Sequence, residues 1–301
     1  MTLSLIQVYT AAGVELRGDA LKRARSRLKA LGFAVELDAS VRLRHQRFAG
    51  TDEQRLQTLR RIADAAPSIA MACRGGYGMT RLLDAIDWKG IARSVARGTR
   101  WVGYSDMTAL QLGLLAHGGA ETWAGPMACD DFGRADDDGG VDDVTRDCFV
   151  EAMSGALHAV GFRTETGFDG LHAKGTLWGG NLAMLCSMLG TRHFPRVKGG
   201  ILFLEEVNEH PYRVERWLLQ LHQAGVLREQ KAVLLGAVSD YRASPLDRGY
   251  TLKSALACVR AASRTPLLSG LPFGHVRTKV TFPLGRRVEL AVQGRDVWIG
   301  W

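Results

Sequence analysis

The sequence predicts an α/β protein, with a doubly wound parallel sheet in its first half and a smaller, β-rich domain after it. Two observations indicate this organisation. Short apolar runs alternate with amphipathic stretches through the first half, which is typical of strands joined by crossover helices. After about residue 165, short strands follow one another among turns. We therefore place the two domains at residues 1–165 and 166–301.

The elements of the first domain follow from periodicity and end signals. One helix carries apolar residues on one side, with Asp19 as its expected N-cap. A second helix has Asp52 and Glu53 in its first turn, as the helix dipole favours. The expected strands are residues 3–9, 33–37, 68–73 and 100–104, and the expected helices are 20–30, 52–65, 80–86 and 106–117.

The second domain contains shorter apolar runs and one clear amphipathic helix. The expected strands are residues 176–178, 200–204, 232–238, 279–282 and 297–299, with the helix at 212–224. Within the first domain, residues 130–143 are rich in aspartate and glycine. We interpret this stretch as a mobile surface loop. Calcium binding is the alternative, but the ligand spacing of an EF-hand loop is absent.

Composition and charge exclude several classes of protein. The chain is 46% hydrophobic and 23% charged, which is ordinary for a globular protein, and its apolar runs are too short for a membrane span. The net charge of +8 raises nucleic-acid binding, but the basic runs near residues 22–29 and 42–47 lack interleaved aromatic residues. We interpret them as solvated surface, and expect neither nucleic-acid nor membrane partners.

The N-terminus and the cysteines favour a reducing compartment. The first residues lack the basic region and apolar core of a secretory signal. The five cysteines form no CxxC motif, so we expect reduced and mostly buried thiols. We also expect no cofactor.

Two loops at strand ends are candidates for chemistry. Ser105 stands between a predicted strand and a predicted helix, which resembles a nucleophile elbow, although a plain helix cap is the alternative. A glycine-rich segment, residues 73–78, follows the preceding strand. In a parallel sheet such loops converge, so this segment could donate a backbone N–H to an oxyanion, form a tight turn, or cradle a phosphate.

A serine nucleophile needs a base and an acid that orients it. His275 lies in a turn before a predicted strand, where a general base is well placed; a structural turn residue is the alternative. Glu205 and Glu206 end a buried strand and point to opposite faces, so only one of them is expected to reach a histidine.

Taken together, these segments resemble the LD-carboxypeptidase family of serine peptidases, which includes the murein tetrapeptide carboxypeptidases. The resemblance rests on six blocks in the same order. They are residues 48–55, 73–83, 103–110, 179–182, 203–216 and 273–275.

The resemblance implies that Ser105 is the nucleophile, His275 the base and Glu205 the orienting acid, with Glu206 the other possibility. It implies an oxyanion hole from the N–H groups of Gly76 and Asp106. It further implies a Rossmann-like first domain, a barrel-like second domain, and a cytoplasmic homodimer that needs no metal.

The expected reaction removes a terminal D-alanine from murein tetrapeptide during peptidoglycan recycling. Arg74 is a candidate for binding the terminal carboxylate, with a structural salt bridge as the alternative. A related hydrolase of peptidyl-nucleotides, like the microcin C self-immunity proteins, is a second possibility. It would need an aromatic shelf, for which Trp178 and Trp123 are conceivable. A non-catalytic binding protein for a small ligand is the third possibility.

Overall fold

The computed structural model describes residues 4–301, which form two compact units. The first unit contains the described residues up to Leu157, together with Thr191–Pro195 and Arg277–Gly285. The second unit contains His158–Gly190, Arg196–Val276 and Arg286–Trp301. The chain therefore passes between the units more than once, which a single boundary near residue 165 does not describe.

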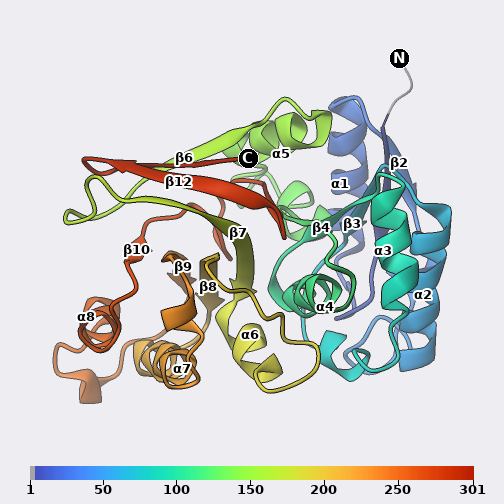
Figure 1. The fold of residues 1–301 in the computed structure, drawn as a ribbon. Helices are drawn as coiled ribbons and strands as arrows, with labels where there is room; N and C mark the ends of the chain where they lie inside the picture. The colour runs from blue at the N-terminus through green and yellow to red at the C-terminus, as the bar shows by residue number, and fades with distance from the viewer. Residues whose placement is uncertain (1–3) are drawn as a thin grey trace. The chain divides into compact units, whose positions relative to one another are not determined.

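The first unit is built on a six-stranded sheet with the strand order β11-β5-β4-β3-β1-β2. Strands β2, β3 and β4 of this sheet are labelled in Figure 1. All neighbouring strands are parallel except the β11–β5 pair. The strands are β1 (Leu5–Tyr9), β2 (Ala34–Leu37), β3 (Ile69–Ala72), β4 (Arg100–Gly103), β5 (Thr122–Ala124) and β11 (Phe282–Leu284). The predicted parallel sheet is confirmed; Leu3, the first residue of the predicted strand, lies outside the described residues.

Five helices accompany this sheet: α1 (Gly18–Ala30), α2 (Asp52–Ala65), α3 (Trp88–Ala96), α4 (Thr108–Gly118) and α5 (Asp143–Ser154). Helices α2, α3 and α4 pack as neighbours, and α1 packs against the turn η4 (Ala128–Phe132). The capping box of Thr51 and Gln54 begins α2 at the predicted residue.

Three local predictions for this unit are wrong. Residue 17, not Asp19, is the N-cap of α1, and Asp19 lies in the first helical turn. The segment 80–86 contains only the end of the short 3-10 turn η2 (Met79–Arg81). The next helix, α3, begins later, after an N-cap at Asp87. The start of the acidic segment 130–143 is the π-helical turn η4, in which Asp131 is buried.

The second unit is built on a seven-stranded mixed sheet with the order β10-β9-β8-β7-β12-β13-β6. Strands β7 to β10 are parallel, and β7, β12, β13 and β6 are antiparallel neighbours. The strands are β6 (Ala159–Arg163), β7 (His172–Asn181), β8 (Ile201–Val207), β9 (Ala232–Ser239), β10 (Leu267–Ser269), β12 (Arg287–Gln293) and β13 (Asp296–Gly300). The predicted β-rich second domain is confirmed, with β6 starting before residue 166.

The two outer strands of this sheet approach each other. Glu165, just after β6, accepts a hydrogen bond of 3.3 Å from the Ser269 N–H of β10, and it pairs with Arg260. A Cβ on Gly270 would lie 2.2 Å from the Arg163 carbonyl oxygen. The sheet therefore curls towards closure, which fits the barrel-like character expected of this domain.

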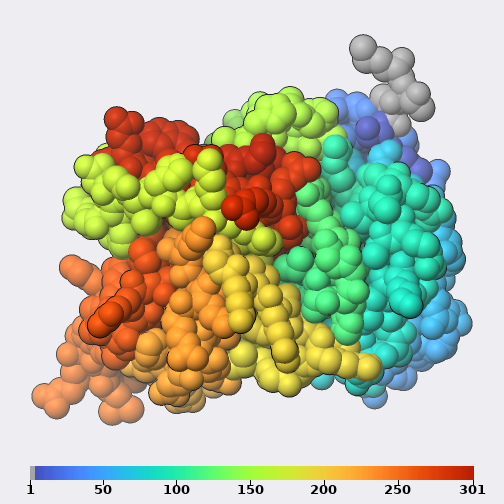
Figure 2. All heavy atoms as spheres, viewed as in Figure 1, coloured from blue at the N-terminus to red at the C-terminus, as the bar shows by residue number. Residues whose placement is uncertain are grey.

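Three helices accompany the second sheet: α6 (Leu182–Met188), α7 (Pro211–Gln223) and α8 (Leu252–Ala262). Helices α7 and α8 pack on one another, and they lie in the orange part of the surface in Figure 2. The predicted helix at 212–224 is α7, whereas α6 and α8 were not predicted. No helix in the described part of the chain is long and apolar enough to cross a bilayer.

One predicted strand belongs to the other sheet. The segment 279–282 was expected in the second domain, but the strand there, β11, begins at Phe282 and pairs with β5 of the first sheet. Pro283 lies in this strand and cannot donate a ladder hydrogen bond. Since β11 is an edge strand, that missing donor is tolerated.

Candidate active site

Ser105 lies where β4 ends and the 3-10 turn η3 (Ser105–Met107) leads into α4. Its φ of +63° is in the left-handed region, which residues with a side chain rarely adopt. The plain helix cap is the wrong interpretation, because Tyr104 and Met107 are the N-caps of η3 and α4. A strained serine on a sharp turn from strand to helix is the geometry of a nucleophile elbow.

The glycine loop after β3 lies directly against this serine. A Cβ built on Gly75 would be 2.7 Å from both the Cβ and the Oγ of Ser105. Only a residue without a side chain allows this approach. Gly76 has a φ of +83°, and a Cβ there would lie 3.3 Å from the Gly13 Cα. The two predicted loops therefore meet at the carboxyl edge of the sheet.

Side chains and backbone hold the loop in place. The Gly13 N–H donates to the Gly75 carbonyl at 3.1 Å. Buried Arg55 donates from Nη1 to the Gly78 carbonyl at 2.8 Å. The Met79 N–H donates to the Asp106 Oδ2 at 2.7 Å, which joins the end of the loop to the residue after Ser105.

Asp106 is 4% exposed, and burial is the main reason that its pKa is raised to about 6. The hydrogen bond from Met79 and the positive charge of Arg55 oppose this rise. Because Asp106 follows Ser105, the carboxylate connects the nucleophile turn to the glycine loop. Its side chain thus has a positioning function besides the oxyanion role expected of its N–H.

Arg74 lies within the loop and is partly buried. Its Nη1 donates to the Val14 carbonyl at 2.8 Å, and no ion pair of its guanidinium is found among the described residues. Its Nε is buried without a hydrogen-bond partner in that part of the chain. The structural salt bridge considered above is therefore not formed.

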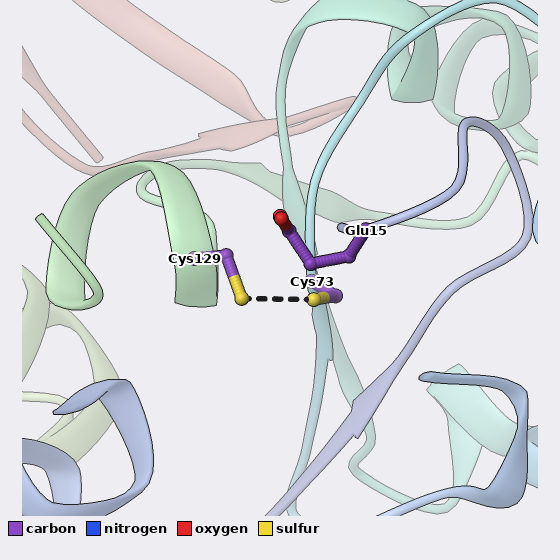
Figure 3. Close-up of side chains that lie close together, drawn as sticks. All are labelled: Glu15, Cys73 and Cys129. Carbon is purple, nitrogen blue, oxygen red and sulfur yellow. Dashed lines mark hydrogen bonds between the residues drawn. The ribbon is translucent and has the colours of Figure 1, made fainter. Parts of the chain in front are cut away.

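Behind the loop lies a buried group of potential metal ligands, shown in Figure 3. Within residues 4–301, one group of side chains has all of its possible metal-ligand atoms within 4.8 Å of one another. It consists of Glu15, Cys73 and Cys129. The two thiols are 3.1 Å apart, and both carboxylate oxygens of Glu15 accept hydrogen bonds from Arg17. The hydrogen bond to Cys73, burial and nearby carboxylates all raise the pKa of Cys129. A thiophilic metal would have to displace these contacts, so we interpret the group as internal support for the loop.

His275 and Glu205 form a close pair in the second unit. Their Nδ1 and Oε2 atoms are 2.7 Å apart, and the Glu205 side chain is fully buried. A carboxylate oxygen accepts, so the Nδ1–H of His275 is the donor in this contact. Gly274 has a φ of +132°, and a Cβ there would lie 3.1 Å from Glu205 Oε2, so this glycine allows the approach.

Glu206 points away from this pair, as alternation along a strand requires. Its Oε1 accepts from the Asn181 Nδ2 at 2.9 Å, and its Oε2 accepts from the Ala183 N–H at 2.7 Å. Burial is the main reason that its pKa is raised. Glu206 therefore serves the start of α6, and Glu205 is the carboxylate that contacts the histidine.

The register of the sheet shifts beside Glu205. Leu204 is opposite Leu235 of β9, whereas Glu206 is opposite Val238, so β9 contains one extra residue. Within that bulge the Ala237 N–H donates to the Phe273 carbonyl at 2.8 Å. This contact fixes the loop that ends in His275.

The predicted site residues thus fall into two groups. Ser105, Arg74, Gly76 and Asp106 lie together in the first unit, and Glu205 and His275 form a pair in the second. Trp178 and Trp123, considered as an aromatic shelf, are 1% and 5% exposed and belong to the core. Sequence reasoning missed Asp131 and Lys279, a buried ion pair of the first unit. A lysine beside an apolar strand was the one available signal.

The two units contain the residue types that a serine hydrolase uses: a strained serine elbow in the first, and a histidine–carboxylate pair in the second. The chain belongs to the LD-carboxypeptidase family. Residues 6–125 match the model of the family's N-terminal domain, and residues 174–290 match that of its C-terminal domain. The resemblance inferred from the sequence is confirmed, and the protein is a carboxypeptidase-type hydrolase.

Individual relatives agree with this assignment. The chain is 31% identical to the murein tetrapeptide carboxypeptidase of Pseudomonas aeruginosa, over 90% of this chain and 88% of that protein. It is 38% identical to the muramoyltetrapeptide carboxypeptidase of Oxalobacter formigenes, with a TM-score of 0.88 over 99% of both chains. The microcin C7 self-immunity protein MccF has a TM-score of 0.86 over 100% of this chain and 97% of its own, at 21% identity, which shows a shared fold.

Proposed function

We propose that this protein is a serine-type LD-carboxypeptidase that releases the terminal D-alanine from murein tetrapeptide. The observation that carries the proposal is the left-handed turn at Ser105, pressed against Gly75. The two carboxypeptidase relatives, one named for murein tetrapeptide and the other for muramoyltetrapeptide, support the choice of substrate. The enzyme acts in peptidoglycan recycling, in the cytoplasm and as a homodimer.

In the proposed reaction, His275 removes the Ser105 proton through its Nε2 while Oγ attacks the carbonyl of the L-centre. The Nδ1–H donates to Glu205, which holds the imidazole in the required tautomer and stabilises its positive charge. The N–H groups of Gly76 and Asp106 receive the oxyanion, and removal of one such donor typically costs about 3 kcal/mol.

The tetrahedral intermediate then collapses, and His275 gives its proton to the departing amine of D-alanine. Water, activated by the same histidine, releases the acyl group and regenerates Ser105. Arg74 binds the terminal carboxylate of the substrate through the donors that its contact with Val14 does not use. This contact gives the enzyme its preference for a free chain end.

The experiment incubates the protein with murein tetrapeptide and follows free D-alanine by mass spectrometry. Parallel reactions contain EDTA, or a peptidyl-nucleotide in place of the tetrapeptide. We expect D-alanine release that EDTA does not affect. Absence of release would refute the proposal, and efficient cleavage of the peptidyl-nucleotide alone would assign the protein to the immunity type of hydrolase.

A further inference from the structure

The turn η4 contacts the glycine loop and also contributes one member of a buried ion pair. On one side, the Cys129 N–H donates to the carbonyl of Cys73, the first residue of the glycine loop, at 2.8 Å. On the other side, Asp131 pairs with the Lys279 ammonium and accepts the Met127 N–H on its Oδ2 at 2.8 Å. The lysine and aspartate side chains are 0% and 2% exposed.

The Lys279 ammonium connects η4 to the nucleophile turn. Its Nζ lies 5.0 Å from the ring centroid of Tyr104, the residue immediately before Ser105. Tyr104 is itself 5% exposed, so this cation–π contact is desolvated and correspondingly strong. The Lys279 ammonium therefore contacts the ring of the residue before the serine, as well as its counter-ion Asp131.

The segment that carries Lys279 is firmly attached to the first unit. The Lys279 N–H donates to the Thr145 Oγ1 at 2.8 Å, and that hydroxyl donates to the Arg277 carbonyl at 2.9 Å. Thr278 donates from Oγ1 to the Asp142 Oδ2 at 2.8 Å. Four residues along the chain from Lys279 is His275. One short segment thus contains the proposed base and the anchor beside the nucleophile turn.

We propose that Lys279 and Asp131 are a positioning pair, which holds Tyr104 and Ser105 in the reactive geometry. This inference rests on the proposed function of Ser105 as the nucleophile. A buried ion pair is a poor device for stability alone, since apolar residues of similar volume often serve as well or better. The contact with Tyr104 gives this pair a second function, which is to fix the strained turn.

The test compares Lys279→Met, Asp131→Leu and the double variant. Each single variant leaves one buried charge without its partner, so both are expected to lower Tm and kcat. The double variant removes both charges and refills the volume, so its Tm recovers. Because Ser105 is then less well held, its kcat for D-alanine release stays roughly 10²-fold below wild type, with KM within about twofold.

A second readout does not depend on the peptide substrate. The rate at which a fluorophosphonate labels Ser105 should fall together with kcat in the double variant. Recovery of kcat and of the labelling rate together with Tm would overturn the proposal, because the pair would then be merely structural. Wild-type protein that is labelled but releases no D-alanine would instead refute the proposed substrate, and the labelling rates would still decide the function of the pair.

Tyr104→Leu provides an independent variant should the double variant fail to fold. It removes the aromatic ring and leaves the ion pair intact, so we expect the same loss of kcat and of labelling rate. Unchanged values would overturn the proposal. Arg260→Met is the matched control, since it breaks the ion pair with Glu165 in the second unit. It is expected to lower Tm without reducing the labelling rate of Ser105.

Discussion

Replacement of Gly75 by alanine tests the approach of the glycine loop to the nucleophile. The added Cβ would lie 2.7 Å from the Ser105 Cβ and Oγ, whereas ordinary contact begins at about 3.4 Å. The Oγ can rotate away, but the Cβ of Ser105 is fixed by its backbone. The loop and the turn must therefore separate by about 0.7 Å, the difference between these two distances.

A displacement of this size is costly for catalysis. Misplacement of a reacting group by about 1 Å can reduce the rate roughly 10²-fold, which corresponds to about 2.7 kcal/mol in the activation free energy. The backbone of Gly75 does not have a positive φ, so alanine introduces the steric contact without backbone strain. We expect kcat for D-alanine release to fall by between ten- and a hundredfold, with a small change in Tm.

Gly18→Ala is the matched control, because a Cβ at that position meets no atom within 4 Å. It should leave kcat unchanged. Both variants are measured by steady-state kinetics of D-alanine release and by thermal unfolding. Full activity in Gly75→Ala would show that the loop can retreat without consequence, and the account of the oxyanion loop would then be wrong.

Three further substitutions test the remaining contacts. Glu205→Gln should lower kcat by about 10³-fold or more, because the amide no longer holds the His275 tautomer whose Nδ1 carries the proton. Glu206→Gln should lower Tm and leave kcat within a fewfold of wild type. Equal losses in kcat would contradict this assignment. In the folded protein the pKa of the Asp106 carboxyl is about 6, against an ordinary value of 3.8. The contribution of the protonated carboxyl to the free energy of unfolding is therefore present below pH 4 and is lost as the pH rises through 6. In urea unfolding, the free energy of unfolding of Asp106→Asn should therefore rise by up to about 3 kcal/mol relative to that of wild type between pH 4 and 7. A difference that does not change with pH would refute the assigned pKa. Arg74→Met should raise KM for the tetrapeptide at least tenfold with a smaller change in kcat, and an unchanged KM would show that another group binds the terminal carboxylate.

The sequence allowed the parallel sheet and the elbow to be predicted because their signals are local. Strand β3 is an uninterrupted apolar run, and β4 ends at Gly103, two residues before Ser105. Alternation also placed Glu205 and Glu206 on opposite faces. Local pattern could not decide which of them meets His275, because that contact joins residues 70 positions apart, and only the family resemblance favoured Glu205.

The failures have the same physical origin. Asp131 was placed in a mobile acidic loop because its partner, Lys279, lies 148 residues away and is invisible to local pattern. The strand at Phe282 was assigned to the wrong domain because the chain returns to the first sheet after residue 276. Helix α3 was missed because it is only 9 residues long and contains Gly90, which disfavours a helix interior; in the structure, Asp87 caps its first turn.

The central claim is that Ser105 is the nucleophile of a carboxypeptidase. The most direct test is the kcat of Ser105→Ala for release of D-alanine from murein tetrapeptide, with thermal unfolding to confirm that the variant is folded. We expect a loss on the order of 10⁶-fold, as for removal of other serine nucleophiles. A folded variant that retains activity within tenfold of wild type would contradict the account.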